Sequence, residues 1–426
     1  MRADLLQPRI MSGCGSLLFT GRSAVRGGAR VRDAVLYTAA FWVFAAALWM
    51  DVRYLGGALG RISTSSMRVH VDFDSFWRSA RALLEGGDIY DTGARLVNLN
   101  PPVWTVLISP LGLMEAIDAY RLFVLLCVLV VLAYLAWTAE ELGLRPVWAV
   151  VGAGLLLLSS PLISTVALGQ VYPVLALGLV AAWILDRRDA PWPSGAALGL
   201  VVALKPSLAP VLLWPLVRRR WDAFAAVCVS GLAATLVGLV VAGPAATWRY
   251  VGVLNEGSAA AYWDNASIPA AMARFFTEHP YAQNAATLPW MVYVGYVLGI
   301  AIVVVTAARI RGGGEAGLWA LVAASLLASP IAWHNYLVLL APGVLLLLAR
   351  GRISLALFLL ALQAIPAQWP LLWNEEGTVG ATFALTLYLY VLLAHWILLL
   401  LAVAPQAPRP DRIAPWGTLR VQTIGA

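Results

Sequence analysis

The chain has 426 residues, of which 61% are hydrophobic and only 12% are charged. Soluble globular proteins carry about 25% charged residues, so this composition excludes a soluble domain, a disordered chain and a fibrous repeat. The net charge of +7 indicates basic loops at a membrane rather than a nucleic-acid-binding face, because no nucleic-acid-binding motif accompanies it. The sequence therefore predicts a polytopic membrane protein.

Apolar runs bounded by Arg, Pro and Gly predict the membrane-spanning helices. A bilayer core about 30 Å thick needs about 20 apolar residues per pass, which gives an all-α fold of about 10–12 passes. Residues 1–33 and 404–426 are expected to be cytoplasmic tails, the first of them disordered, around one transmembrane domain at 34–403. The expected passes are 34–54, 119–138, 147–160, 170–185, 221–243, 289–309, 317–331, 336–349, 353–370 and 379–403.

Two further apolar segments are interrupted by proline. Residues 101–114 begin with two prolines and are too short to span, so a dip into the membrane is expected there. Residues 194–217 contain Lys205, Pro206 and Pro210. Short Arg-rich loops belong in the cytoplasm, and both flanks of 194–217 carry arginines. This segment is therefore predicted to enter and return as two half-helices that meet near Lys205 and Pro206.

The same rule gathers the polar, Pro- and Gly-interrupted segments on the opposite side of the membrane. They are the first outer loop 55–118, the Gly169-Gln170 connection, the second outer loop 244–288, the turn 329–336 and the short loop with Asn374, Glu375 and Glu376. A site that faces away from the cytoplasm follows from this distribution.

Lys205 is the one lysine of the chain, and it lies between Leu204 and Pro206 in an apolar stretch. An ionisable residue at that depth indicates a functional site, and an ammonium group suits a phosphate oxygen. The alternative is a side chain that extends to the membrane interface.

The first outer loop contains two acids before an amphipathic pattern. Phe76, Trp77 and Ala80 share one face of an expected short helix in the membrane surface. Asp74 stands where an N-cap belongs and is a secondary candidate acid. Asp72 precedes the helix between two apolar residues, and partial burial there would make it a general base; the alternative is a solvated loop acid.

Three further polar residues lie in the predicted outer segments. His334 and Asn335 follow Trp333 in a turn between two passes, where a histidine is either a packing residue or a site residue. Asn265 begins an Asn-Ala-Ser sequence, which is either a glycosylation acceptor or a polar ligand of a sugar or phosphate. No metal-ligand spacing and no phosphate-binding glycine loop is present, so neither a metal, a nucleotide donor nor another cofactor is expected.

Taken in order, these landmarks resemble glycosyltransferase family 87, membrane enzymes of the GT-C class, over about residues 34 to 400. The matching pieces are Asp72-Phe73 with Phe76-Trp77, Gly87-Asp88-Ile89-Tyr90-Asp91, Asn100-Pro101-Pro102, Gly169-Gln170, Lys205-Pro206, Asn265-Ala266-Ser267 and Ser329-Pro330-Ile331-Ala332-Trp333. The resemblance implies a polyprenyl-monophosphate sugar donor, with the position of Asp72 as the catalytic base. Members include mannosyltransferases of phosphatidylinositol mannosides and arabinofuranosyltransferases of cell-wall arabinan.

The sequence departs from this family after Trp333. The mannosyltransferases show paired histidines one residue later, where this chain has His334, Asn335 and Tyr336. The expected function is an inverting transfer of mannose, another hexose or arabinofuranose to a glycolipid or polysaccharide acceptor, at the outer face of the plasma membrane and among its lipids. Asp72 is the expected base, and Lys205, His334, Asn335, Asn265 and Gln170 are expected to bind the donor. The alternative is a transporter or flippase of a lipid-linked sugar.

Overall fold

The computed structural model describes residues 17–55, 68–256, 261–366 and 378–403, and these residues form helices without a β-strand. This confirms the all-α prediction. The N-terminal and central helices are α1 (Leu17–Leu55), α3 (Val71–Glu85), α4 (Pro102–Ile108), η1 (Ser109–Leu113), α5 (Ala116–Leu142), α6 (Pro146–Leu157), α7 (Ser160–Leu168), α8 (Tyr172–Arg187), α9 (Pro191–Leu204), η2 (Pro206–Leu212) and α10 (Leu213–Val217). The remaining helices are α11 (Trp221–Glu256), α12 (Ile268–Phe276), α13 (Met291–Ile310), α14 (Gly317–Ala328), η3 (His334–Leu340), α15 (Ala341–Ala349), α16 (Ile353–Ala364), α18 (Val379–Leu385) and α19 (Leu387–Leu401).

Long apolar helices lie at the periphery of the helical bundle. Their length and apolar composition make this an integral membrane protein. Among the described residues, four helical segments are long and apolar enough to cross a bilayer: 30–53, 116–142, 221–253 and 291–310. Two bent helix pairs, α6 with α7 and α18 with α19, raise this number to six. The remaining apolar helices are shorter, so the expected 10–12 passes stay a prediction. One expectation was wrong: α1 begins at Leu17, so residues 17–33 are helical rather than disordered.

Residues 191–217 form the predicted hairpin. Helix α9 ends at Lys205, whose φ of −143° and ψ of 85° lie outside the helical region, because the following Pro206 disfavours a helical residue before it. The chain returns through η2 and α10. Arg218 donates to Asp186 at 2.6 Å and Arg220 donates to Asp189 at 2.8 Å, so both ends of the hairpin lie at the same end of the bundle.

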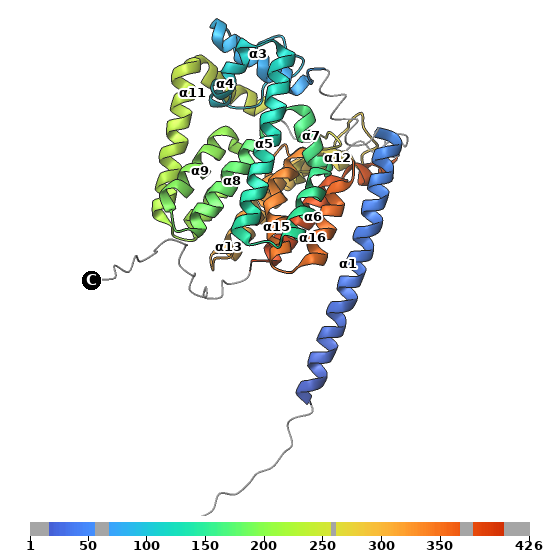
Figure 1. Ribbon diagram of the computed structural model, residues 1–426. Helices are drawn as coiled ribbons and strands as arrows, with labels where there is room; N and C mark the ends of the chain where they lie inside the picture. Colours follow the sequence, from blue (N-terminus) through green and yellow to red (C-terminus); the bar gives the residue numbers. More distant parts are fainter. Residues whose placement is uncertain (1–16, 56–67, 257–260, 367–377, 404–426) are drawn as a thin grey trace, which may run out of the picture.

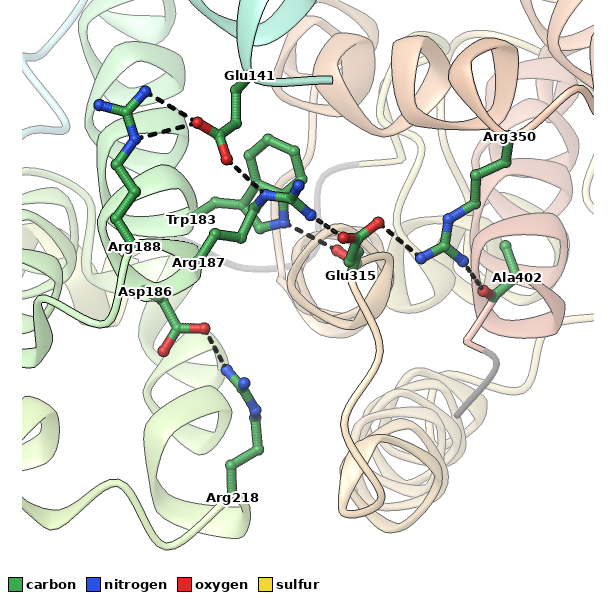
Figure 2. A network of polar contacts seen from close by, with 9 residues as sticks. All are labelled: Glu141, Trp183, Asp186, Arg187, Arg188, Arg218, Glu315, Arg350 and Ala402. Atoms are coloured by element: carbon green, nitrogen blue, oxygen red, sulfur yellow. Dashed lines mark hydrogen bonds and ion pairs between the residues drawn. The ribbon is translucent and has the colours of Figure 1, made fainter. Parts of the chain in front are cut away.

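A network of ion pairs joins the Arg-rich loops at that end of the bundle (Figure 2). Arg187 donates to Glu141 at 2.9 Å and also to Glu315, and Arg350 donates to the other oxygen of Glu315 at 2.8 Å. Arg350 also donates to the carbonyl of Ala402 at 3.1 Å. The Arg-rich loops that the positive-inside rule assigned to one side of the membrane therefore lie together in the structure.

The opposite end of the bundle carries the outer-loop helices. Figure 1 shows α3 and α4 together at that end, above α9 and α8, with α7 and α12 below them in the upper part of the bundle. The indole of Trp77 in α3 donates to the carbonyl of Met114 at 3.1 Å, which ties the segment 101–114 to α3. The core of the bundle is formed by α14, where every residue from Gly317 to Leu327 is buried. Helix α15 is buried in the same way from Ala341 to Leu348.

Candidate active site

Helix α3 places the candidate base Asp72 in its first turn. His70 is the N-cap, and its Nδ1 accepts the backbone N–H of Asp72 at 3.3 Å. The predictions that Asp74 caps this helix and that Asp72 precedes it were therefore wrong, because the imidazole of His70 supplies the acceptor four residues earlier. Asp74 instead accepts from Arg78, one turn later, at 2.8 Å. Both acids lie near the positive end of the helix dipole, which favours negative charge.

A glycine brings Gln170 to Asp72. Helix α7 ends at Gly169, which has a φ of +67° that favours glycine. A Cβ atom on Gly169 would lie 3.0 Å from the Cβ of Phe73, so the close approach of α7 to α3 also depends on the missing side chain. The next residue reaches the base: Nε2 of Gln170 donates to Oδ2 of Asp72 at 2.7 Å. The structure therefore joins two of the predicted site residues that lie 98 positions apart.

The surroundings of Asp72 raise the pKa of its carboxyl group above the ordinary value. The main cause is burial, which disfavours the charged form. The nearby His70 and the hydrogen bond from Gln170 act in the opposite direction, and the charge of Asp264 adds to the increase. Burial likewise lowers the pKa of His70, while the charge of Asp72 raises it. A buried carboxylate with a raised pKa and a fixed orientation is suited to general-base chemistry.

His334 lies at the start of η3 and is bonded through both ring nitrogens. Its Nδ1 lies 3.0 Å from Oδ2 of Asp264, and its Nε2 lies 2.9 Å from Oγ of Ser164. The ring is buried and packs against Tyr388 at 5.1 Å between ring centroids. The direct donor contact expected of His334 is not supported, because protein partners occupy both nitrogens. Sequence analysis missed Asp264 and Ser164, although Asp264 directly precedes the Asn-Ala-Ser sequence.

Asn265 ties two loops together. Its Oδ1 accepts from the backbone N–H groups of Ala332 at 2.9 Å and Ser267 at 3.2 Å, and its Nδ2 donates to the carbonyl of Pro330 at 3.1 Å. Asn265 is also fully buried and forms a β-bridge with Trp333. Both earlier expectations for Asn265, a ligand of the donor and a glycosylation acceptor, disagree with this burial and these bonds.

Arg274 binds the backbone of the loop that contains Asp264 and Asn265. Its Nη1 donates to the carbonyls of Tyr262 at 2.7 Å and Asn265 at 2.9 Å, on either side of Asp264. Its Nε donates to Oγ1 of Thr386 at 3.2 Å. Arg274 is fully buried, and burial lowers its pKa to about 10 although the charge of Asp264 acts in the opposite direction. Arg274, which sequence analysis also missed, therefore fixes the position of Asp264.

Lys205 points into the protein and toward this region. Its Nζ lies 5.2 Å from the ring centroid of Tyr336 and 5.9 Å from that of Tyr172, distances at which a cation is attracted to an aromatic face. The two rings lie 4.1 Å apart. Tyr172 follows Gln170 by two positions and Tyr336 follows His334 by two positions. The predicted lysine therefore lies against η3, which carries His334, and against the start of α8, which follows the residue bonded to Asp72.

Asn335 is the residue between His334 and Tyr336. Its carbonyl accepts from Oγ1 of Thr165 at 3.1 Å, and its side chain is fully buried. Neither polar atom of that side chain has a hydrogen-bond partner in the part of the chain that the structure describes. Its expected contact with the donor stays a prediction. Asn374, Glu375 and Glu376, expected on the same face, lie outside the described residues.

The half-buried Asp72 and the single lysine, Lys205, thus lie in an all-helical membrane protein whose class the comparisons with known proteins define. The family model of glycosyltransferase family 87 matches residues 98–330, more than half of the chain, and the chain belongs to this family. The resemblance inferred from the sequence motifs is thereby confirmed.

Relatives with assigned functions include mycobacterial enzymes. A polyprenol-phosphate-mannose-dependent α-(1-2)-phosphatidylinositol mannoside mannosyltransferase of Mycobacterium tuberculosis is 30% identical over 353 residues, which cover 75% of this chain and 81% of that protein. An α-(1→3)-arabinofuranosyltransferase of the same species is 29% identical over 176 residues, which cover 39% of this chain and 41% of that protein. Among solved structures, ArnT from Cupriavidus metallidurans in the apo state is 17% identical, with a TM-score of 0.35 over 88% of this chain and 77% of that one.

Proposed function

We propose that this glycosyltransferase moves a sugar from a polyprenyl-monophosphate donor to a hydroxyl group of a glycolipid or polysaccharide. The observation that carries the proposal is the half-buried Asp72 carboxylate, which Gln170 orients at 2.7 Å. Tyr172, two residues after Gln170, lies against Lys205. The mycobacterial mannosyltransferase, which matches over most of both chains, is named for a polyprenol-phosphate-mannose donor. The sugar is therefore mannose, another hexose or arabinofuranose.

In the proposed reaction, Asp72 removes the proton of the acceptor hydroxyl. The oxygen then attacks the anomeric carbon on the face opposite the phosphate, while the bond from that carbon to the phosphate oxygen breaks. The ammonium of Lys205 binds the phosphate as a point charge. A single carboxylate base is consistent with inversion, because retaining enzymes commonly use two carboxyl groups about 5 Å apart. The second acid of the site, Asp264, is bonded to His334 instead.

The proposed location follows from the two ends of the bundle. The arginine network lies at one end, which the positive-inside rule assigns to the cytoplasm. Asp72 and its neighbours lie on the outer-loop helices at the other end. We therefore propose that the protein resides in the plasma membrane, among whose lipids the polyprenyl tail lies, and acts on its outer face.

The test compares Asp72→Asn with Asp74→Asn in the full-length protein purified in detergent. The two residues lie in the same first turn, but Asp74 pairs with Arg78 and does not contact Gln170. Base catalysis contributes about 10²–10⁴-fold, so Asp72→Asn is expected to lose at least 100-fold in transfer. Asp74→Asn is expected to retain most activity.

The donors are labelled polyprenyl-phosphate mannose, glucose and arabinofuranose, and the acceptor is a mycobacterial glycolipid extract. Full transfer by Asp72→Asn would remove this residue from the mechanism. Movement of the donor between leaflets of a vesicle, without any labelled product, would instead favour a flippase.

A further inference from the structure

Three side chains from distant parts of the chain form a continuous hydrogen-bonded series beside the proposed base. Oδ2 of Asp264 lies 3.0 Å from Nδ1 of His334, and Nε2 of His334 lies 2.9 Å from Oγ of Ser164. They come from the loop before α12, from the start of η3 and from α7. The His334 side chain is buried, whereas Asp264 and Ser164 on either side of it are both half-buried. The buried ring therefore links an inner end at Asp264 to an outer end at the partly exposed hydroxyl of Ser164.

The inner end of this series is held from several directions. The backbone N–H of His334 donates to the carbonyl of Asp264 at 2.9 Å, in addition to the side-chain contact. Arg274 and Asn265 fix the loop on both sides of Asp264, as described above. Fixing the carboxylate of Asp264 against the imidazole of His334 in this way sets the orientation of the ring.

The outer end lies on the helix that also serves the base. Ser164 belongs to α7, and the end of α7 at Gly169 contacts Phe73 and places Gln170 on Asp72. Lys205, the proposed phosphate ligand, lies against Tyr336, two residues after His334. The helix of Ser164 therefore contacts α3, and its partner His334 lies in the helix whose Tyr336 contacts Lys205.

We propose that Asp264, His334 and Ser164 form a proton relay whose outer end, the hydroxyl of Ser164, protonates the departing polyprenyl phosphate. This inference rests on the proposed transfer reaction and assigns a general acid to it. Ser164 is the group that contacts the phosphate, and Asp264 and His334 are positioning residues that act through it.

The proton balance of this step is complete. With His334 protonated, Nδ1–H donates to Asp264 and Nε2–H donates to Ser164, so the hydroxyl proton of Ser164 is directed away from the ring. As the bond from the anomeric carbon to oxygen breaks, that proton moves to a phosphate oxygen and the Nε2 proton moves to Ser164. A phosphate monoester accepts a second proton near pH 6, so it is a suitable acceptor. Asp72 holds the proton of the acceptor hydroxyl, and solvent later exchanges it with neutral His334.

One charged group within the relay and three around it bear on its pH dependence. Asp264 contacts the ring directly, and Arg274 lies behind Asp264 and interacts with its charge. Asp72 also interacts with the charge of Asp264. Lys205 lies against the ring of Tyr336, and the phenol ring of Tyr388 packs against the imidazole of His334.

The experiment measures kcat against pH for the full-length protein, with the donor that the wild type uses best among the three labelled polyprenyl-phosphate sugars. The variants are Ser164→Ala, Ser164→Thr and Asp264→Asn. The control is Ser325→Ala, which removes a buried hydroxyl that donates only to the carbonyl of Leu321 in its own helix, at 2.7 Å. Thermal unfolding in detergent verifies that each variant is folded.

Because the relay supplies a proton to the phosphate, the wild type is expected to lose activity on the alkaline side of its profile. Ser164→Ala and Asp264→Asn are expected to lower kcat by about 100-fold, and Ser164→Ala to abolish the alkaline decline while the acid side, set by Asp72, stays unchanged. Ser164→Thr restores the decline because it keeps a hydroxyl group.

A folded Ser164→Ala variant that keeps the wild-type rate, or a slow one that keeps the alkaline decline, would overturn the relay while transfer itself stands. Absence of transfer by the wild type from every donor would overturn the proposed function, and the relay with it.

Discussion

Replacing Gln170 tests whether Asp72 acts as the base, because this substitution changes the basicity of Asp72 without removing the carboxylate. The amide of Gln170 donates to Oδ2 of Asp72 at 2.7 Å and lowers the pKa of the acid. Gln170→Leu removes the donor at similar size. The pKa of Asp72, already raised by burial, then rises further, and a larger fraction of the acid is protonated and inactive at any given pH. The acid limb of the activity profile therefore moves to higher pH.

The size of this shift follows from the strength of the bond. A hydrogen bond to a charged group contributes about 1.5–3 kcal/mol, and one pKa unit corresponds to about 1.4 kcal/mol, so the limb is expected to move by about one to two pH units. Because Asp72 is only part-buried, water replaces some of the lost bond and the lower figure applies. Gln170→Glu adds a negative charge beside Asp72 and is expected to shift the limb further than Gln170→Leu.

The assay is kcat/KM for sugar transfer between pH 4.5 and 8 in one mixed buffer. Gln283→Leu is the matched control, because Gln283 is exposed in the loop between α12 and α13. A Gln170→Leu profile that is lower at every pH but has an unmoved acid limb would refute the reasoning, since Gln170 would then shape the site without setting the ionisation of Asp72.

Substitutions at two further positions probe the proposed phosphate ligand and the ion-pair network. Lys205→Met is expected to raise KM for the donor at least tenfold, a loss of about 1.4 kcal/mol, and Lys205→Arg to recover part of it because the charge remains; an unchanged KM would contradict phosphate binding. Glu315→Gln weakens the contacts of Arg187 and Arg350 and is expected to cost about 1.5–3 kcal/mol of stability. The loss of stability is checked by thermal unfolding in detergent, where Glu315→Gln is expected to have a lower Tm and to retain transfer at low temperature.

Local sequence signals were sufficient for the features that depend on neighbouring residues. Pro206 after Lys205 stops α9, and the flanking arginines require the hairpin to return, so both the break and the direction of 191–217 were predictable. Asp72 was identifiable because an acid between apolar residues at the start of an amphipathic helix is unusual. The arginine loops were grouped correctly because one physical rule, the positive-inside rule, acts on all of them.

The rest depends on contacts between segments far apart in the chain. His334 lies 70 positions from Asp264 and 170 from Ser164, and no local pattern specifies which of many polar residues will meet. Asn265 had the appearance of a surface acceptor because its sequence context says nothing about the strand-like pairing with Trp333 that buries it. The start of α3 was misplaced for a simpler reason: an aspartate is the commoner N-cap, and the histidine that takes this role was overlooked.

The burial of α14 bears on how the protein responds to the lipid around it. Helices longer than the local bilayer adapt by tilting, and shorter ones deform the bilayer or draw on flanking residues. Helix α14 has only 12 residues, but protein surrounds it from Gly317 to Leu327, so it has no acyl chains to match. Changes in membrane thickness therefore act on the long peripheral helices α1, α5, α11 and α13. The half-length central helices pack against protein instead, so membrane thickness does not act on them directly.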